Sequence, residues 1–238
     1  MQTDRQWKLE AVLVLGAGLM ISLSFGMLLS LALHRVEPDL SVSQEKFWAF
    51  VISGVSFQGA GLALAHFFLK QHELTWAEFL GLKGPNLRRA TLLGVVTAAL
   101  VIPLTLFLNK QAGRLITFFQ GTPEIQPTMQ VLQLSVSLGQ RLCFGAAAIL
   151  VAPVVEEVLF RGILYRTIKQ QGHPMLGLFL SSLLFGAIHA NLMTLIPLAF
   201  LAAVLALLYD RTNNLMAPIL AHSLFNAVNL FIFLLSPP

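Results

Sequence analysis

The sequence predicts an all-α, polytopic bundle of about seven transmembrane helices, with six or eight as the alternatives. Its 15 basic and 11 acidic residues make up only 11% of the 238 residues, and 56% of the chain is hydrophobic. Soluble domains carry about 25% charged residues, and the mean hydropathy here is +0.77. Disorder needs the opposite composition, with low hydrophobicity and high net charge. Strands of a membrane barrel would alternate apolar and polar residues, and the sequence has no such alternation.

Seven apolar runs account for the predicted helices, because a spanning helix needs about 20 mostly apolar residues. They are 11–33, 47–69, 90–108, a run that begins near Val136 and carries charges at its far end, 174–190, 193–209 and 216–235. The first run is longer than the apolar core of a signal peptide, and no Ala-x-Ala site closes it. We therefore expect it to remain in the protein as a helix.

The distribution of basic residues predicts that the N-terminus lies inside the cell. Nine Lys and Arg residues, Arg5 and Lys8 among them, fall on the side of the N-terminus, and five fall on the other side.

Segment 74–83 carries Trp76 and Phe79 before Gly84-Pro85, which predicts a short helix in the inner headgroup layer, with a polar loop as the alternative. The net charge of +4 is assigned to topology and lipid headgroups, and no nucleic-acid partner is expected.

The chain is predicted to form a single integral-membrane domain over 1–238, because no repeat or linker divides it. The single cysteine, Cys143, rules out an intramolecular disulfide. Its apolar neighbours predict a buried thiol.

Three charged residues stand at the end of the fourth apolar run, where the bilayer disfavours charge. They are Glu156, Glu157 and Arg161. Each ionised side chain near the bilayer centre costs about 2.5–3.5 kcal/mol, so such residues face the bundle interior and are usually functional. Glu157 and Arg161 are four residues apart and are expected to pair along one helix face. Glu156 is rotated by about 100° and is expected to face a different partner. The alternative is that all three residues merely cap the helix at the inner interface.

Two later runs add polar residues to this set. His189 lies fifteen residues into the fifth run, and His222 and Asn226 share one face of the seventh because they are four apart. A carboxylate and an imidazole flanking one water can deprotonate it, while a second imidazole and an amide can stabilise an oxyanion. Two His and one Glu can also hold a hydrolytic zinc ion. Both alternatives end in hydrolysis of a carbonyl group.

Three short motifs occur in order on separate apolar runs: Glu156-Glu157-x-x-x-Arg161, Phe185-x-x-x-His189 and His222-x-x-x-Asn226. This ordered set resembles the CPBP group of intramembrane proteases, the CAAX protease and bacteriocin-processing family, also called the Abi family. Type II CAAX prenyl endopeptidases belong to that group. The resemblance covers about 139–235 and implies a protease core there, with the helices 11–33, 47–69 and 90–108 as accessory spans.

The resemblance implies an intramembrane endopeptidase in a bacterial cytoplasmic membrane, with a membrane-associated protein or peptide of the CAAX or leader-peptide kind as substrate. It assigns water activation to Glu156 and His189, and it assigns oxyanion stabilisation to His222 and Asn226. Glu157, Arg161 and Phe185 would support these groups. A divalent metal such as zinc, held by Glu156, His189 and His222, stays open.

Two other functions remain as alternatives. Buried Glu, Arg and His also build proton relays, so a proton-coupled transporter is one of them, although the inverted repeats typical of transporters are absent from the sequence. The other is a catalytically inert membrane scaffold or immunity protein. No His-Glu-x-x-His motif occurs, which argues against a zincin-like membrane protease.

Overall fold

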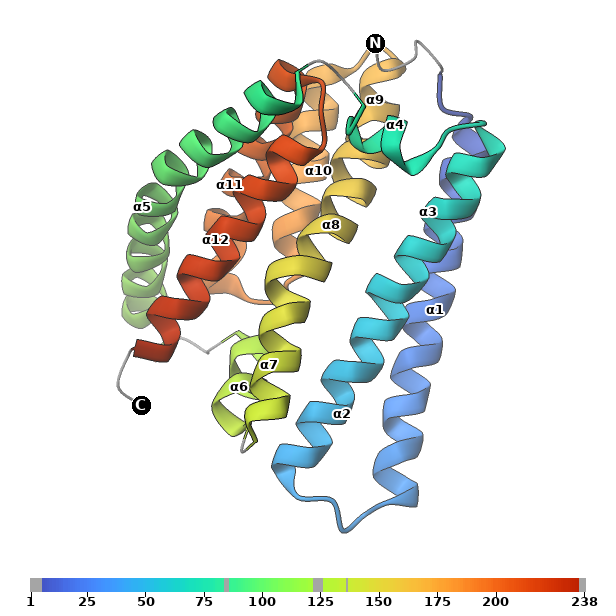
Figure 1. Ribbon diagram of the computed structural model, residues 1–238. Helices are drawn as coiled ribbons and strands as arrows, with labels where there is room; N and C mark the ends of the chain where they lie inside the picture. Colours follow the sequence, from blue (N-terminus) through green and yellow to red (C-terminus); the bar gives the residue numbers. More distant parts are fainter. Residues whose placement is uncertain (1–5, 84–85, 122–125, 136, 236–238) are drawn as a thin grey trace.

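The computed structural model describes residues 6–83, 86–121, 126–135 and 137–235, which form helices joined by short turns, without a strand among them (Figure 1). Arg5, Gly84, Pro85 and Val136 lie outside the described residues. Within the described part, six helices are long and apolar enough to cross a membrane, and a shorter apolar helix joins them. The predicted polytopic helical bundle is confirmed.

The helices follow one another in a mostly up-and-down order. The first half contains α1 (Leu9–Val36), α2 (Val42–Gly54), the π-helical segment η1 (Val55–Gly59), α3 (Ala60–Gln71), α4 (Trp76–Leu80) and α5 (Leu87–Gln120). The second half contains α6 (Pro127–Leu134), α7 (Leu138–Ala146), η2 (Ala147–Val151), α8 (Ala152–Glu157), η3 (Val158–Tyr165), α9 (Arg166–Gln170), α10 (Pro174–Ala187), α11 (Leu192–Thr212) and α12 (Met216–Leu235). The stretch Leu138–Gln170 is one continuous helix, which we call the carboxylate helix.

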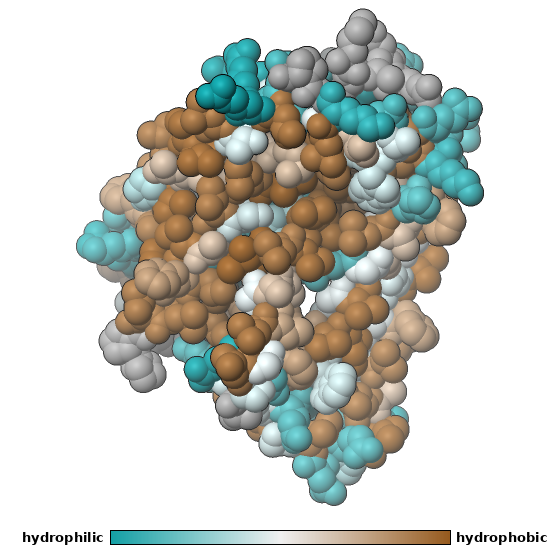
Figure 2. Space-filling view, viewed as in Figure 1, coloured by the Kyte–Doolittle hydropathy of each residue, from teal (hydrophilic) through white to brown (hydrophobic). Residues whose placement is uncertain are grey.

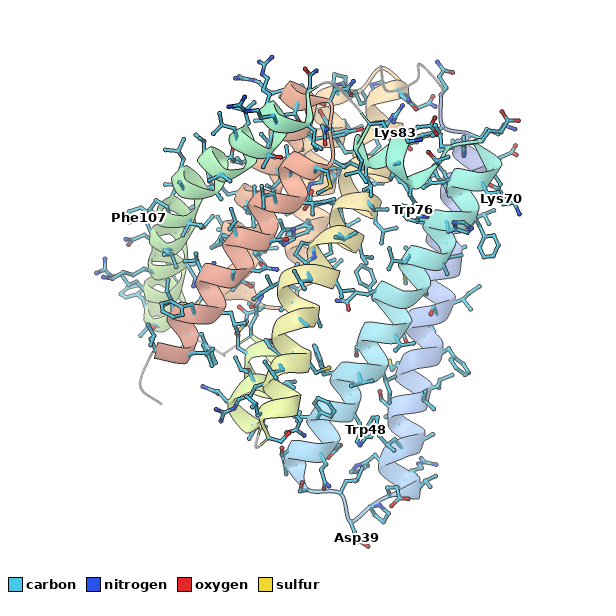
Figure 3. All side chains as sticks on the ribbon, viewed as in Figure 1. Asp39, Trp48, Lys70, Trp76, Lys83 and Phe107 are labelled. Carbon is cyan, nitrogen blue, oxygen red and sulfur yellow. The ribbon has the colours of Figure 1, made fainter. Side chains whose placement is uncertain are left out.

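The surface shows where a membrane would lie. On the face shown in Figure 2, apolar side chains form a broad belt across the middle of the bundle, and hydrophilic side chains gather at its two ends. Lys70 and Lys83 lie at one end and Asp39 at the other, with Trp76 and Trp48 just inside these ends (Figure 3). Tryptophan favours the membrane–water interface. The molecule is therefore built as a multi-pass integral membrane protein.

Two helices differ in length from the predicted runs. The run predicted at 90–108 is part of α5, whose 34 residues measure about 51 Å. In contrast, α10 has 14 residues and measures about 21 Å, less than the roughly 30 Å hydrocarbon core. The run predicted at 174–190 ends early because Ala190 has a left-handed φ of 49° and Asn191 caps α11 by accepting a hydrogen bond from the Thr194 N–H.

The predicted short helix near 74–83 is present as α4. Thr75 and Glu78 form a reciprocal capping box at its start, and Gly81 ends it with a φ of 80°. Phe79 is buried and lies against Gly162 of the carboxylate helix, where an added Cβ would come within 2.5 Å of its ring. The helix therefore docks onto the bundle as well as lying at its end.

The prediction that Cys143 is buried is wrong. Cys143 is exposed on α7, and its neighbours Leu138 and Leu142 are exposed too. Among the described residues nothing covers this side of α7, so the apolar sequence around the thiol marks an exposed surface in a chain built to cross a membrane.

Small residues allow close approach of the helices that carry the polar motifs. Gly186 of α10 packs directly on α11, so that an added Cβ would lie 2.6 Å from the Leu195 carbonyl oxygen. The same Cβ at Gly145 of α7 would meet only Leu230 at 3.8 Å, an ordinary contact. Close packing through small residues is the usual way in which membrane helices associate.

We expect Gly186→Ala to destabilise the protein by about 1–3 kcal/mol, because the backbone of α11 must move away. Gly145→Ala is the matched control and should change stability by less than about 0.5 kcal/mol. Thermal unfolding in detergent measures both. Equal melting temperatures for the two variants would contradict the close approach of α10 and α11.

Candidate active site

The two carboxylates lie on a stretch of helix that is locally underwound into π geometry on both sides. Pro153 lacks an N–H, and its ring crowds the carbonyl four residues earlier, so a regular α-helix cannot pass through it. The π segment η2 precedes the proline, and η3 follows Glu157 directly. Such π segments frequently occur at functional sites. Here they flank the short helix α8, which carries Glu156 and Glu157 at its end.

Glu157 is a buried junction between two helices. Its Oε1 accepts hydrogen bonds from Arg161 Nη1 at 2.8 Å and from His222 Nδ1 at 2.8 Å. All three residues are buried: Glu157 is 0% exposed, Arg161 1% and His222 2%. Arg161 also donates from Nη2 to the Ala202 carbonyl oxygen of α11 at 3.0 Å. The predicted Glu157–Arg161 pair is confirmed, and it ties the carboxylate helix to α11 and α12.

His222 is held in one orientation by this junction. The carboxylate of Glu157 only accepts, so His222 Nδ1 carries the proton of that hydrogen bond. In the neutral ring Nε2 is then free to accept, and it lies 3.8 Å from Oε2 of the buried Glu156. That distance is too long for a direct hydrogen bond and lets both atoms contact one water molecule. The expectation that Glu156 and Glu157 face different partners is wrong, since they face the two nitrogens of the same imidazole.

The ring of Phe185 joins the site to α10. The guanidinium of Arg161 lies over this ring, 4.7 Å from its centre. The ring centres of His222 and His189 lie 5.6 Å and 5.0 Å from that of Phe185. Phe185 is fully buried, so its ring is a shared packing partner of both imidazoles and of Arg161.

His189 lies in the turn after α10, two residues beyond the helix end, and not within the helix as the sequence suggested. Its Nδ1 is 2.7 Å from the Phe185 carbonyl oxygen, which can only accept. The neutral ring therefore carries its proton on Nδ1 and presents Nε2 as a free base or ligand atom. His189 as a whole is half-buried.

Asn226 compensates for a missing backbone donor. The Ala152 N–H donates to Ala147 in π geometry, and Pro153 has no N–H, so the Ala148 carbonyl has no regular helical donor. Asn226 Nδ2 donates to this oxygen at 2.8 Å. The carbonyl groups of Ala148 and Ala202 were not predicted from the sequence to be part of the site. Pro153 could have indicated Ala148, because a proline leaves a carbonyl earlier in the helix without its N–H donor. Nothing in the sequence pointed to Ala202.

The donor set for a metal is not assembled in this structure. Among the described residues, no group of three His, Cys, Asp or Glu side chains is placed to hold a metal ion. Glu156 and His222 converge, but Asn226 is engaged with Ala148. The geometry provides a carboxylate–imidazole pair, in which Glu156 and His222 face each other.

Comparison with known proteins agrees with the resemblance found in the motifs. Residues 138–228 match the family model described as "Type II CAAX prenyl endopeptidase Rce1-like". A protein of Bacillus subtilis (strain 168), named "Putative membrane peptidase YdiL", is 32% identical over 77 residues. That alignment covers 32% of this chain and 32% of the relative. No solved structure matches the chain.

These matches confirm the resemblance to the CPBP and CAAX protease group, over the segment that carries the carboxylate helix and α10 to α12. The chain is thus a multi-pass membrane protein with a segment that is similar to the type II CAAX prenyl endopeptidase family. The aligned part spans about a third of the curated relative.

We expect Arg161→Leu to destabilise the protein by about 3–5 kcal/mol, because it leaves the buried Glu157 carboxylate without its cationic partner. The double variant Glu157→Gln/Arg161→Leu should recover much of this loss, since it removes both charges. Thermal unfolding in detergent provides the comparison. If the double variant is as unstable as Arg161→Leu or worse, Glu157 is not the charge that Arg161 compensates.

Proposed function

We propose that this protein is an intramembrane endopeptidase that hydrolyses a peptide bond in a membrane-associated protein or peptide. The observation that carries the proposal is the pairing of Glu156 Oε2 with His222 Nε2 across 3.8 Å, inside a bundle whose surface is apolar. A buried, nearly unpaired carboxylate next to an oriented imidazole is disfavoured in a membrane and is typical of a functional site. The family match and the relative named as a membrane peptidase support the same class of reaction.

Glu156 and His189 would activate the attacking water. The water oxygen adds to the carbonyl carbon of the peptide bond, and its proton passes to Glu156. His189, whose ring packs against Phe185, keeps Nε2 free of the Phe185 carbonyl and would orient the water or the substrate. When the tetrahedral intermediate collapses, the C–N bond breaks and Glu156 returns the proton to the leaving amine. The products are a carboxylate and an amine.

His222 would stabilise the oxyanion. Arg161 balances the charge of Glu157, so a proton on His222 Nε2 would balance that of Glu156 and leave the buried cluster neutral. The protonated ring then has an N–H directed into the site, which donates to the developing oxyanion. The Asn226 amide donates one N–H to the Ala148 carbonyl oxygen and has a second N–H that could also donate to the oxyanion. Glu157 acts through His222 by holding its ring and its proton.

A divalent metal is the alternative to a protein-activated water. Glu156 and His222 would be two of its ligands, and His189 the third, and the metal would polarise the carbonyl and acidify the water. The side chains are not gathered for this in the described residues. We therefore assign the proton transfers to Glu156 and the histidines.

The proposed enzyme lies in the bacterial cytoplasmic membrane with its N-terminus inside. The two termini lie at opposite ends of the bundle (Figure 1). On this orientation α4 lies at the inner surface. Substrates of the CAAX or leader-peptide kind would present their cleavage site from the membrane, and the exposed apolar surface of α5 and α12 is compatible with a membrane-associated substrate.

We expect Glu156→Gln to abolish peptide cleavage in proteoliposomes, by at least about 100-fold, because the amide cannot accept the proton of the water. Its melting temperature should change little, since Glu156 Oε2 makes no direct hydrogen bond at 3.8 Å. Glu45→Gln, at a half-buried position on α2 where the carboxylate pairs with His34 and not with the site, is the control and should retain activity. Full activity of Glu156→Gln would refute the assignment. Inactivity of the wild type on membrane-associated peptides would favour an inert scaffold.

We expect cleavage to survive treatment with metal chelators, and elemental analysis to find less than one equivalent of zinc in active protein. Here the proton transfers require only side chains. Loss of activity with a chelator, followed by recovery on adding Zn²⁺ but not Mg²⁺, would establish the metal-dependent mechanism instead.

A further inference from the structure

A second polar site lies at the end of the bundle where α5 begins, away from the carboxylates. A small open pocket is lined there by five residues: Asn86, Arg89, Ala90, Arg211 and Thr212. Arg89 comes from the first turn of α5 and Arg211 from the last turn of α11, so two guanidinium groups from separate helices border one space. Hydrophilic side chains gather at this end of the molecule, directly above the apolar belt (Figure 2).

Neither guanidinium is neutralised by the protein. Among the described residues, Arg89 and Arg211 make no hydrogen bond or ion pair. The first turn of α5 contains no acidic residue. Asp210, next to Arg211, is already engaged by the Tyr165 hydroxyl and the Lys169 ammonium, each at 2.7 Å. Two unpaired arginines in one pocket favour an anion, and their planar donors suit phosphate oxygens.

The surface below the pocket points to a lipid as the source of that phosphate. On α5, Leu92 and Val96 follow Arg89 on the same face, three and seven residues deeper, with 62% and 46% exposure. On α11, Leu207 lies one turn deeper than Arg211 and is 48% exposed. A free phosphate would use only the arginines, whereas a phospholipid would also cover these apolar side chains with its acyl chains.

We propose that Arg89 and Arg211 form a binding site for the phosphate of an anionic phospholipid, whose acyl chains lie along α5 and α11. The predicted orientation places this end of the bundle at the inner leaflet, where anionic lipids attract basic residues. The site anchors the start of α5 against α11 at the membrane surface. It is independent of the proposed peptidase activity, because none of its residues contacts the carboxylate–imidazole pair.

The test measures lipid binding to the full-length protein in detergent by native mass spectrometry, with phosphatidylglycerol, phosphatidylcholine and inorganic phosphate as separate ligands. We expect phosphatidylglycerol to bind at least fivefold more tightly than phosphatidylcholine, and inorganic phosphate to bind far more weakly than either lipid. Arg89→Gln and Arg211→Gln should each weaken phosphatidylglycerol binding about fivefold, and the double variant more than tenfold.

Arg88→Gln is the matched control, because it removes the same charge one position away and Arg88 does not line the pocket. It should retain binding within about twofold. All three arginines are exposed, and unchanged melting temperatures would verify folding. Equal losses for Arg88→Gln and Arg89→Gln would reduce the effect to diffuse surface charge and overturn the site. Wild-type binding in the double variant, or phosphate binding as tight as that of the lipid, would overturn it too.

Discussion

The buried carboxylate of Glu157 is the interaction on which the arrangement of the site depends. Removing a carboxylate and a guanidinium from water costs several kcal/mol for each ion, and only a close, well-oriented partner compensates for this. Glu157 meets this condition with Arg161 on its own helix and with His222 on α12, both at 2.8 Å. Arg161 extends the connection to the Ala202 carbonyl of α11 and to the ring of Phe185 on α10. One charged group thus sets the positions of four helices relative to each other, and the tautomer of His222 follows from the same contact.

Local distortion of the carboxylate helix complements this junction. The turn before Pro153 has π geometry, and the Ala148 carbonyl, which lacks a helical donor because Pro153 has no N–H, accepts a hydrogen bond from Asn226 of α12. Helix α12 is therefore attached at two levels, through His222 to the carboxylates and through Asn226 to Ala148 in the π segment, about two turns earlier on the carboxylate helix. The face that carries both residues is determined by their spacing of four, and α12 contacts both α8 and η2 of the carboxylate helix.

The sequence predicted those features that depend on local periodicity. Apolar runs located the spanning helices, and the spacing of Glu157 and Arg161 predicted their pair, because both follow from helix geometry alone. It placed His189 inside a helix, since nothing in an apolar run reveals that Ala190 adopts a left-handed conformation and ends α10 early. The sequence also predicted a separate partner for Glu156, whereas the structure places it opposite the same His222 ring as Glu157. The rotation of α12 about its axis is decided by packing, and residue spacing does not reveal it. The roles of the site residues, the substrate and the use of a metal stay predictions.

The most direct test of the account is the protonation of the His222 ring, measured by ¹⁵N NMR on histidine-labelled protein, with the His222 signals assigned by their loss in His222→Ala. The account predicts a proton on Nδ1, bonded to Glu157, in both the neutral and the charged ring. It also predicts that Glu157→Gln shifts the Nδ1 signal while leaving that of His189 unchanged. A neutral His222 with its proton on Nε2 and a bare Nδ1 would contradict the Glu157 junction and the site built on it.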